Sequence, residues 1–162
     1  MSPLVILQHV PLWVWLLLAG LIALGLRSSR NRTSPVWLMI LPSALVILGL
    51  RSLIALQVSP LVWALFAIAY GLGVLLGLKL QPRWTVARSG PTVTLRGEYL
   101  TLILMLALFG VNFALGMAQA VAPQLASSLP VPHGFAVFEG VASGIFLGRA
   151  LSVLRQPRHQ MA

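Results

Sequence analysis

The chain has 162 residues, of which 59% are apolar and only 8% are charged, and its mean hydropathy is +0.95. A soluble domain usually carries about 25% charged residues, so lipid must cover part of this chain, which excludes a purely soluble globule. The net charge of +9 is what the basic cytoplasmic flanks of membrane helices produce, so we expect a lipid bilayer and not nucleic acid as its partner.

Five apolar runs approach the length of about 20 residues that a helix needs to span a bilayer. They cover approximately residues 10–26, 36–58, 61–78, 99–121 and 134–154. We therefore predict an all-α fold, an integral membrane five-helix bundle that forms a single transmembrane domain over residues 1–162. The first run is short, and it lacks the basic region and the cleavage site of a signal peptide, so we expect an uncleaved helix.

The distribution of basic residues predicts the orientation of the bundle. Ten of the eleven Lys and Arg residues follow the first run, connect the third run to the fourth, or lie near the end of the chain. The connections "QVSP" and "APQLASSLPVPH" contain none. The positive-inside rule therefore places the N-terminus outside and the C-terminus in the cytoplasm.

The cytoplasmic segment "QPRWTVARSGPTVTLRGE" joins the third and fourth runs. Its pieces "TVAR" and "TVTLR" favour strands and flank the turn residues Ser89, Gly90 and Pro91, which predicts a short β-hairpin. An irregular solvated loop is the alternative. In the second run, Pro42 predicts a kink in the helix.

Arg51 lies inside the second run, about 10 Å below its outer end at 1.5 Å per residue. An arginine at the centre of a span costs about 2.5–3.5 kcal/mol on insertion scales. Glu139 is the only acidic residue within any run, and its depth of about 8 Å is similar. We therefore predict an Arg51–Glu139 ion pair that holds the second run beside the fifth. The alternative is an arginine that only snorkels towards the outer headgroups.

Further polar residues lie in the same outer half of the predicted bundle: Tyr70, Asn112, Gln119 and Ser143. Asn112 and Gln119 are seven residues apart and therefore share one helix face. With Arg51 and Glu139, these residues are candidates for a ligand site that opens outward. They are equally candidates for hydrogen bonds that hold neighbouring helices together.

Small residues recur at intervals of four in two of the runs: Ala136, Gly140, Gly144 and Gly148 in the fifth, and Ala69, Gly73 and Gly77 in the third. Such ladders let helix backbones approach closely in lipid. They indicate either close packing within one bundle or homodimerisation through the fifth run.

No pattern indicates an enzyme, since a phosphate-binding glycine loop, a metalloprotease helix and a nucleophile elbow are all missing from the sequence. The absence of cysteine excludes disulfides, thiolate metal sites and c-type haem attachment. His9 and His133 are expected at the outer surface and His159 in the cytoplasmic tail, all of them outside the apolar centres of the spans. We expect no metal and no cofactor.

The stretch "QHVPLWVWLLLAGLIALGLRSSRNR" at residues 8–32 resembles the start of a family of small bacterial inner-membrane proteins of unknown function. "LMILP" in the second run and "TVTLRGEYLTLILMLALF" are also similar to that family and, more distantly, to CcdC-type membrane proteins. The resemblance implies a multi-pass protein of the bacterial inner membrane. CcdC-type proteins are associated with cytochrome c maturation. The motifs carry no chemistry, so no functional residue is transferred.

From these features we expect a non-catalytic, structural or accessory protein of the bacterial inner (cytoplasmic) membrane. It would contact itself, as a homodimer, or another membrane protein through helix–helix contacts in the lipid plane. The alternative is a small dimeric transporter or channel for a small anion, with the anion held by Arg51 and gated by competition with Glu139. A second alternative is a helper in cytochrome or redox assembly.

Overall fold

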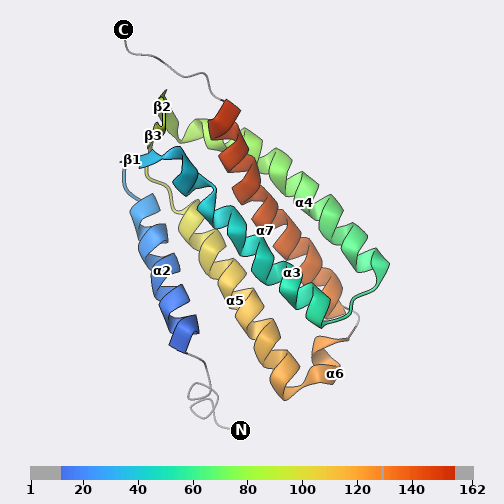
Figure 1. Cartoon of the computed structure of the whole chain (residues 1–162). Helices are drawn as coiled ribbons and strands as arrows, with labels where there is room; N and C mark the ends of the chain where they lie inside the picture. The colour runs from blue at the N-terminus through green and yellow to red at the C-terminus, as the bar shows by residue number, and fades with distance from the viewer. Residues whose placement is uncertain (1–11, 129, 156–162) are drawn as a thin grey trace.

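The computed structural model describes residues 12–128 and 130–155, and the chain is mainly helical (Figure 1). Within these residues, four helical segments are long and apolar enough to cross a membrane: Val36–Ala55, Pro60–Arg83, Leu100–Val121 and Pro130–Arg155. They coincide with four of the five predicted runs. The first predicted run forms the shorter apolar helix α2 (Leu12–Ser28), while residues 10 and 11 lie outside the described part. The length and composition of these helices are those of a multi-pass membrane protein.

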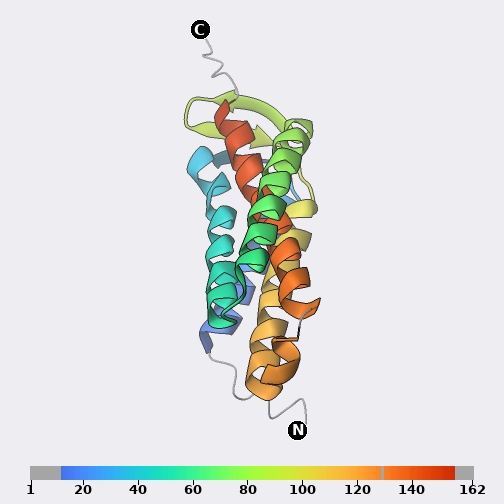
Figure 2. The same ribbon diagram turned by 90° about the vertical axis from the view of Figure 1, so that its right-hand side faces the viewer.

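Helix α7 (Pro130–Arg155) lies at the centre of the bundle and packs mainly along α4 (Pro60–Leu80) (Figures 1 and 2). The two helices meet through their predicted ladders of small residues. A Cβ atom on Gly144 would lie 2.3 Å from the carbonyl oxygen of Tyr70, and one on Gly73 would lie 2.3 Å from that of Val141. The ladders therefore pack within one chain, and α4 covers the face of α7 that homodimerisation would need. Of the two interpretations of the ladders, the structure shows close packing within one bundle.

The second predicted run is not one continuous α-helix. It begins with two short 3₁₀ segments, η1 (Val36–Met39) and η2 (Leu41–Leu45), and only Val46–Ala55 forms the α-helix α3. Pro42 stands at the start of η2. Because proline has no N–H to donate to the preceding turn, the helix is interrupted there, as the sequence predicts. A turn in which Gln57 has a φ of 48° leads into α4.

A small sheet closes one end of the bundle. The predicted hairpin is confirmed: β2 (Thr85–Ser89) and β3 (Thr92–Leu95) pair antiparallel around Gly90, whose φ is 54°. The sequence did not predict β1 (Arg32–Pro35), which pairs antiparallel with the other edge of β3 in the order β1-β3-β2. An all-α fold is therefore correct except at this end.

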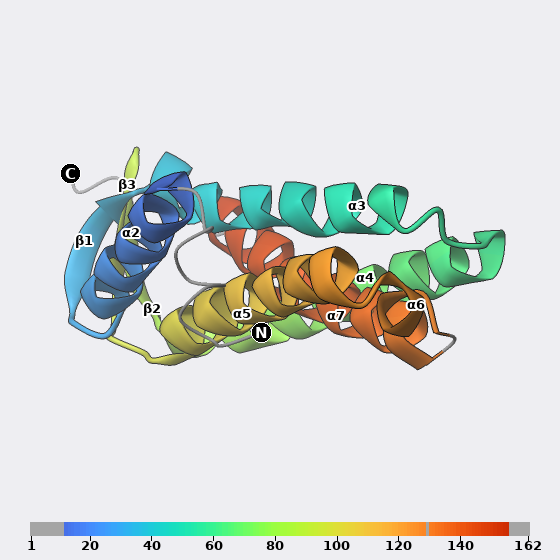
Figure 3. The same ribbon diagram turned by 90° about the horizontal axis from the view of Figure 1, so that it is seen from below.

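The sheet lies beside the C-terminal end of α7, and α6 (Pro123–Ala126) lies at the opposite end of the bundle (Figures 1 and 3). Helix α5 (Leu100–Val121) separates α2 from α7, so α2 and α4 lie on opposite sides (Figures 1 and 3). Arg88 of β2 fixes the sheet to α7, because its guanidinium donates to the carbonyl oxygens of Val153 at 2.9 Å and Leu154 at 2.6 Å. These are carbonyls that a helix C-terminus leaves without a partner in the helix.

Candidate functional site

Glu139 is fully buried in the middle of the bundle, with 0% of its surface exposed. Asn112 of α5 donates its Nδ2 to Oε2 of Glu139 at 2.8 Å, and the Ser143 hydroxyl, one turn along α7, donates to Oε1 at 3.1 Å. Both carboxyl oxygens are therefore hydrogen-bonded by neutral donors. The predicted grouping of Glu139, Asn112 and Ser143 is confirmed.

Helix α3 completes this arrangement with a residue that the sequence analysis missed. The hydroxyl of Ser52 donates to Oδ1 of Asn112 at 3.0 Å, so hydrogen bonds link α3 to α5 and α5 to α7. Gly49 lies against the Glu139 carboxyl, and a Cβ atom there would come within 2.2 Å of Cδ. We call Ser52, Asn112, Glu139 and Ser143 the Glu139 cluster.

The predicted Arg51–Glu139 ion pair is wrong. Arg51 is exposed, whereas Glu139 is fully buried and bonded to other residues. The reason is helical geometry: Gly49 faces Glu139, and at 100° per residue Arg51 lies about 200° further round α3. The buried positions of α3, Gly49 and Leu53, mark its inward face in the sequence. With this face of α3 turned inward, Ser52 reaches Asn112 and Arg51 points away from Glu139, a direction that depth along the helix alone does not give.

Two other candidates lie apart from the cluster. The ring of Tyr70 stacks on Phe66, one turn earlier in α4, at a centroid distance of 5.9 Å. Gln119 is half-buried near the end of α5. Among the described residues, no hydrogen bond joins either side chain to the Glu139 cluster. Of the six residues that the sequence grouped in an outward-opening site, only Asn112, Glu139 and Ser143 therefore lie together, and Ser52 joins them.

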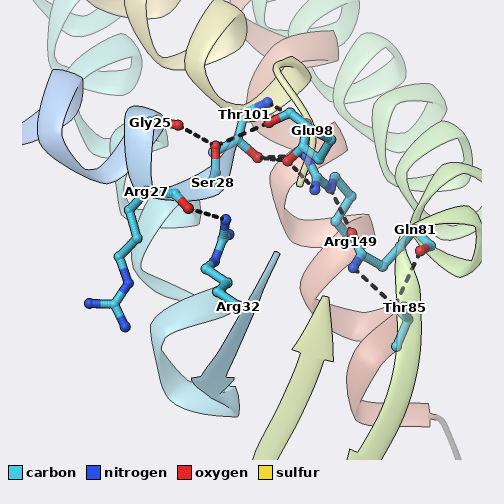
Figure 4. Close-up of polar contacts among 9 residues, drawn as sticks. All are labelled: Gly25, Arg27, Ser28, Arg32, Gln81, Thr85, Glu98, Thr101 and Arg149. Carbon is cyan, nitrogen blue, oxygen red and sulfur yellow. Dashed lines mark hydrogen bonds and ion pairs between the residues drawn. The ribbon is translucent and has the colours of Figure 1, made fainter. Parts of the chain in front are cut away.

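A second buried cluster lies at the sheet end of the bundle and was not predicted. Arg149 of α7 donates Nη2 to Oε1 of Glu98 at 2.8 Å, Nη1 to Oγ1 of Thr101 at 2.8 Å, and Nε to Oε1 of Gln81 at 2.7 Å (Figure 4). The ring of Trp84 faces the same guanidinium at 5.1 Å. We call Gln81, Glu98, Thr101 and Arg149 the Glu98 cluster.

All four members of the Glu98 cluster are buried, with exposures of 0% for Gln81 and 3% for Arg149. Glu98 also closes the N-terminus of α5, because its Oε2 accepts the backbone N–H of Thr101 at 2.9 Å and its Oε1 accepts the Thr101 hydroxyl. An acidic group at this position satisfies a free N–H and the positive end of the helix dipole. The cluster therefore joins α4, α5 and α7 at one point.

The electrostatics of the Glu98 cluster keep its carboxyl group ionised. Burial raises the pKa of Glu98. The charge of Arg149 and the hydrogen bonds from Thr101 and Arg149 together lower this pKa by more than burial raises it, so the pKa lies below the usual value. Glu98–Arg149 is the one ion pair within the described residues. The chain has only two acidic residues, and Arg149 interrupts the fifth run as Arg51 interrupts the second. This was the signal that the sequence analysis did not use.

The chemistry of both clusters is hydrogen bonding between helices, with one carboxyl paired to a cation and the other to neutral groups. In the described residues, no group of three or more His, Cys, Asp and Glu side chains could hold a metal ion. His9 and His159 lie outside the described part. Comparison of the chain with family models, with curated proteins and with solved structures finds no match.

Proposed function

We propose that this protein is a non-catalytic structural or accessory protein of a bacterial inner membrane that acts through helix–helix contacts in the lipid plane. The observation that carries the proposal is the contrast between the two faces of α4. Its ladder face is sealed against α7, while its opposite face carries exposed large apolar side chains: Leu61, Ile68, Leu72 and Leu75. Their spacing of seven, four and three residues forms one stripe along the helix.

This stripe is suited to a lateral partner. A facing helix can contact residues at this spacing along one stripe, since packing and not hydrophobic exclusion holds helices together in a membrane. The polar residues of the two clusters, by contrast, are hydrogen-bonded to each other. In this proposal the clusters hold the bundle rigid, and the outer stripe of α4 makes the contact with a second copy or with another membrane protein.

The proposed orientation of the protein in the membrane rests on the positions of its basic loops. The sheet carries Arg32 and Arg88, and the connections next to it carry Arg30, Arg83 and Arg96. We place this end in the cytoplasm and the N-terminus outside, with α2 as the fifth span. Because the chain has no cysteine, single substitutions give a clean test. An impermeant thiol reagent added to intact cells should label Ser127→Cys and Ser59→Cys, and should label Ser89→Cys only after lysis.

The contact surface is tested by photo-crosslinking in native membranes. A photoreactive residue at Leu72, on the outer stripe, should give a discrete protein adduct, either of twice the mass of the chain or with one other membrane protein. The matched control is the same residue at Ile47, an exposed apolar position on α3. If Leu72 and Ile47 both give only lipid adducts, the outer stripe is not a contact surface and the proposal fails.

The structure bears differently on the two alternative functions that the sequence suggested. The anion carrier required Arg51 beside Glu139, and the position of Arg51 removes that form of it. The redox-assembly alternative stays a prediction, which the haem spectrum of the purified protein tests. A second function is favoured by one specific observation, the burial of the Glu139 carboxyl among neutral groups only. Intramembrane acids of this kind mark proton or cation pathways.

Proton movement through the Glu139 cluster is tested in liposomes with a pH-sensitive dye. Under the scaffold proposal, wild type and Glu139→Gln show the same background flux. A wild-type flux that Glu139→Gln abolishes, while Glu98→Gln retains it, would replace the scaffold with a proton pathway.

A further inference from the structure

A pocket opens between α2 and the interrupted second span. It is lined by residues from α2, β1, η1, η2, α5 and α7 and has an empty volume of about 490 Å³, its open mouth included. The pocket exists because residues 36–45 form 3₁₀ turns around Pro42 and not a full α-helix beside α2.

The wall of the pocket is apolar. Its apolar lining residues include Leu24 of α2, Met105 of α5, Phe146 of α7, and Leu41 and Pro42 of η2. Met105 and Phe146 belong to the same buried cluster, whereas Leu41 is 46% exposed at the mouth. The apolar lining therefore includes both an exposed residue and buried ones, as contact with a hydrocarbon chain requires.

The pocket also has cationic lining residues. Arg27, Arg32 and Arg149 all line it. Arg27 is exposed, and Arg32 is held over the end of α2 because its Nη1 donates to the carbonyl oxygen of Arg27 at 3.0 Å (Figure 4). Glu98 is the one carboxylate in this group, and it is already occupied by Arg149. Two positive charges therefore remain without a negative partner of their own in the described structure.

The electrostatic surroundings of Arg32 are consistent with two arginines that lack a carboxylate partner of their own. Burial lowers the pKa of Arg32, Glu98 raises it, and Arg149 and Arg27 lower it again. The guanidinium groups repel each other across the pocket, and an added negative charge would relieve the repulsion. Arginine suits an oxyanion such as phosphate, because its planar group can donate two parallel hydrogen bonds.

We propose that this pocket binds one anionic phospholipid, with its phosphate at Arg27 and Arg32 and one acyl chain along Leu24, Met105 and Phe146. Basic pockets between membrane helices on the cytoplasmic side commonly bind anionic headgroups. The site lies at the sheet end of the bundle, so its assignment to the cytoplasmic leaflet rests on the proposed orientation. The binding itself does not, because a nanodisc presents the same lipid on both leaflets.

The test measures the thermal stability of the full chain in nanodiscs of phosphatidylcholine, with and without added phosphatidylglycerol, and counts the lipids retained by native mass spectrometry. Phosphatidylglycerol should raise the melting temperature of the wild type and remain bound to it. The variant Arg27→Gln/Arg32→Gln should lose this shift, with affinity reduced about thirtyfold, as expected for two interfacial arginines. The charge-matched control is Arg83→Gln/Arg96→Gln, since both residues are exposed and basic and neither lines the pocket.

A third variant tests the apolar wall while leaving the arginines in place. Leu24→Trp should fill the pocket and displace the lipid without changing the charge. The proposal is overturned if the control loses the shift as fully as Arg27→Gln/Arg32→Gln, because the effect is then general surface charge. It is also overturned if inorganic phosphate or glycerophosphate in detergent stabilises the wild type as much as the lipid does. Labelling of Ser89→Cys from outside would change the leaflet and contradict the proposed orientation, but it would leave the binding result intact.

Discussion

Gly49 of α3 lies directly against the carboxyl group of Glu139 on α7, so closely that the smallest side chain would overlap it. This contact explains why the buried acid and its hydrogen-bond donors fit between three helices. The glycine leaves room for the carboxyl group, and the neighbouring Ser52 and Asn112 then complete the hydrogen-bond chain.

The first prediction concerns this contact. Gly49→Ala should destabilise the protein by about 1–3 kcal/mol, the usual cost of an overpacked core. The control is Gly110→Ala on α5, where a new Cβ atom meets nothing within 4 Å. Reversible unfolding in mixed micelles gives both free energies. Equal stability of the two variants would show that Glu139 moves away at no cost.

The second prediction concerns the ladder between α4 and α7. Gly73→Ala should lower the free energy of unfolding by about 1–3 kcal/mol, because its Cβ atom would press on the backbone carbonyl of Val141, which cannot rotate away. Gly71→Ala is an internal control, since it lies two residues away in the same helix and faces open space. A thermal melt in detergent compares them, and a destabilised Gly71→Ala would point to a general intolerance of α4 to substitution.

The third prediction concerns the Glu98–Arg149 ion pair. Removing one partner leaves the other buried and unpaired, so Arg149→Met and Glu98→Gln should each cost about 3 kcal/mol. The double variant should cost clearly less than the sum of the two, because it leaves no buried charge. Unfolding of all four proteins in micelles measures the coupling. Additive losses would mean that the two residues do not depend on one another.

The fourth prediction concerns pH. Because the folded state lowers the pKa of Glu98, the ion pair contributes its full stability above the ordinary glutamate pKa of about 4.3. That contribution is lost as the pH falls below it, through the lowered value. The measurement is best made in a Glu139→Gln background, where Glu98 is the only acidic side chain in the chain. Thermal stability should be level from pH 7 to about 5 and should fall at lower pH.

The corresponding control adds Glu98→Gln to that background. Its stability should be lower at neutral pH and should show no fall of this size in acid. A steep acid transition in the double variant would assign the effect to another group.

Much of the helical pattern could be predicted from the sequence, because runs such as 99–121 have both the length and the apolarity of a span. The hairpin around Gly90 was visible for the same reason, since strand-favouring residues flank turn residues. Strand β1 was not, because "RTSP" has no apolar alternation and forms a strand only through its pairing with β3. A pairing partner some sixty residues away leaves no local signal.

The candidate site was predicted in part. Depth along a helix correctly grouped Glu139, Asn112 and Ser143, because residues at one level of neighbouring helices can meet. Depth alone does not say which way a side chain points, and this is where Arg51 was misplaced. Arg149 was counted with the basic end of the chain, and its burial became visible only when Gln81, Glu98 and Thr101 converged on it.

The central position of α7 also determines the order in which this protein can become stable. Ribosomes make the chain from its N-terminus, so α7 enters the membrane after α2, α3, α4 and α5. Until it arrives, Asn112 has no carboxyl group to bond, Glu98 has no cation, and the ladder of α4 faces lipid. The earlier helices therefore lack the contacts that α7 supplies, and a ribosome that stalls before residue 130 leaves behind a product whose Asn112 and Glu98 are without these partners.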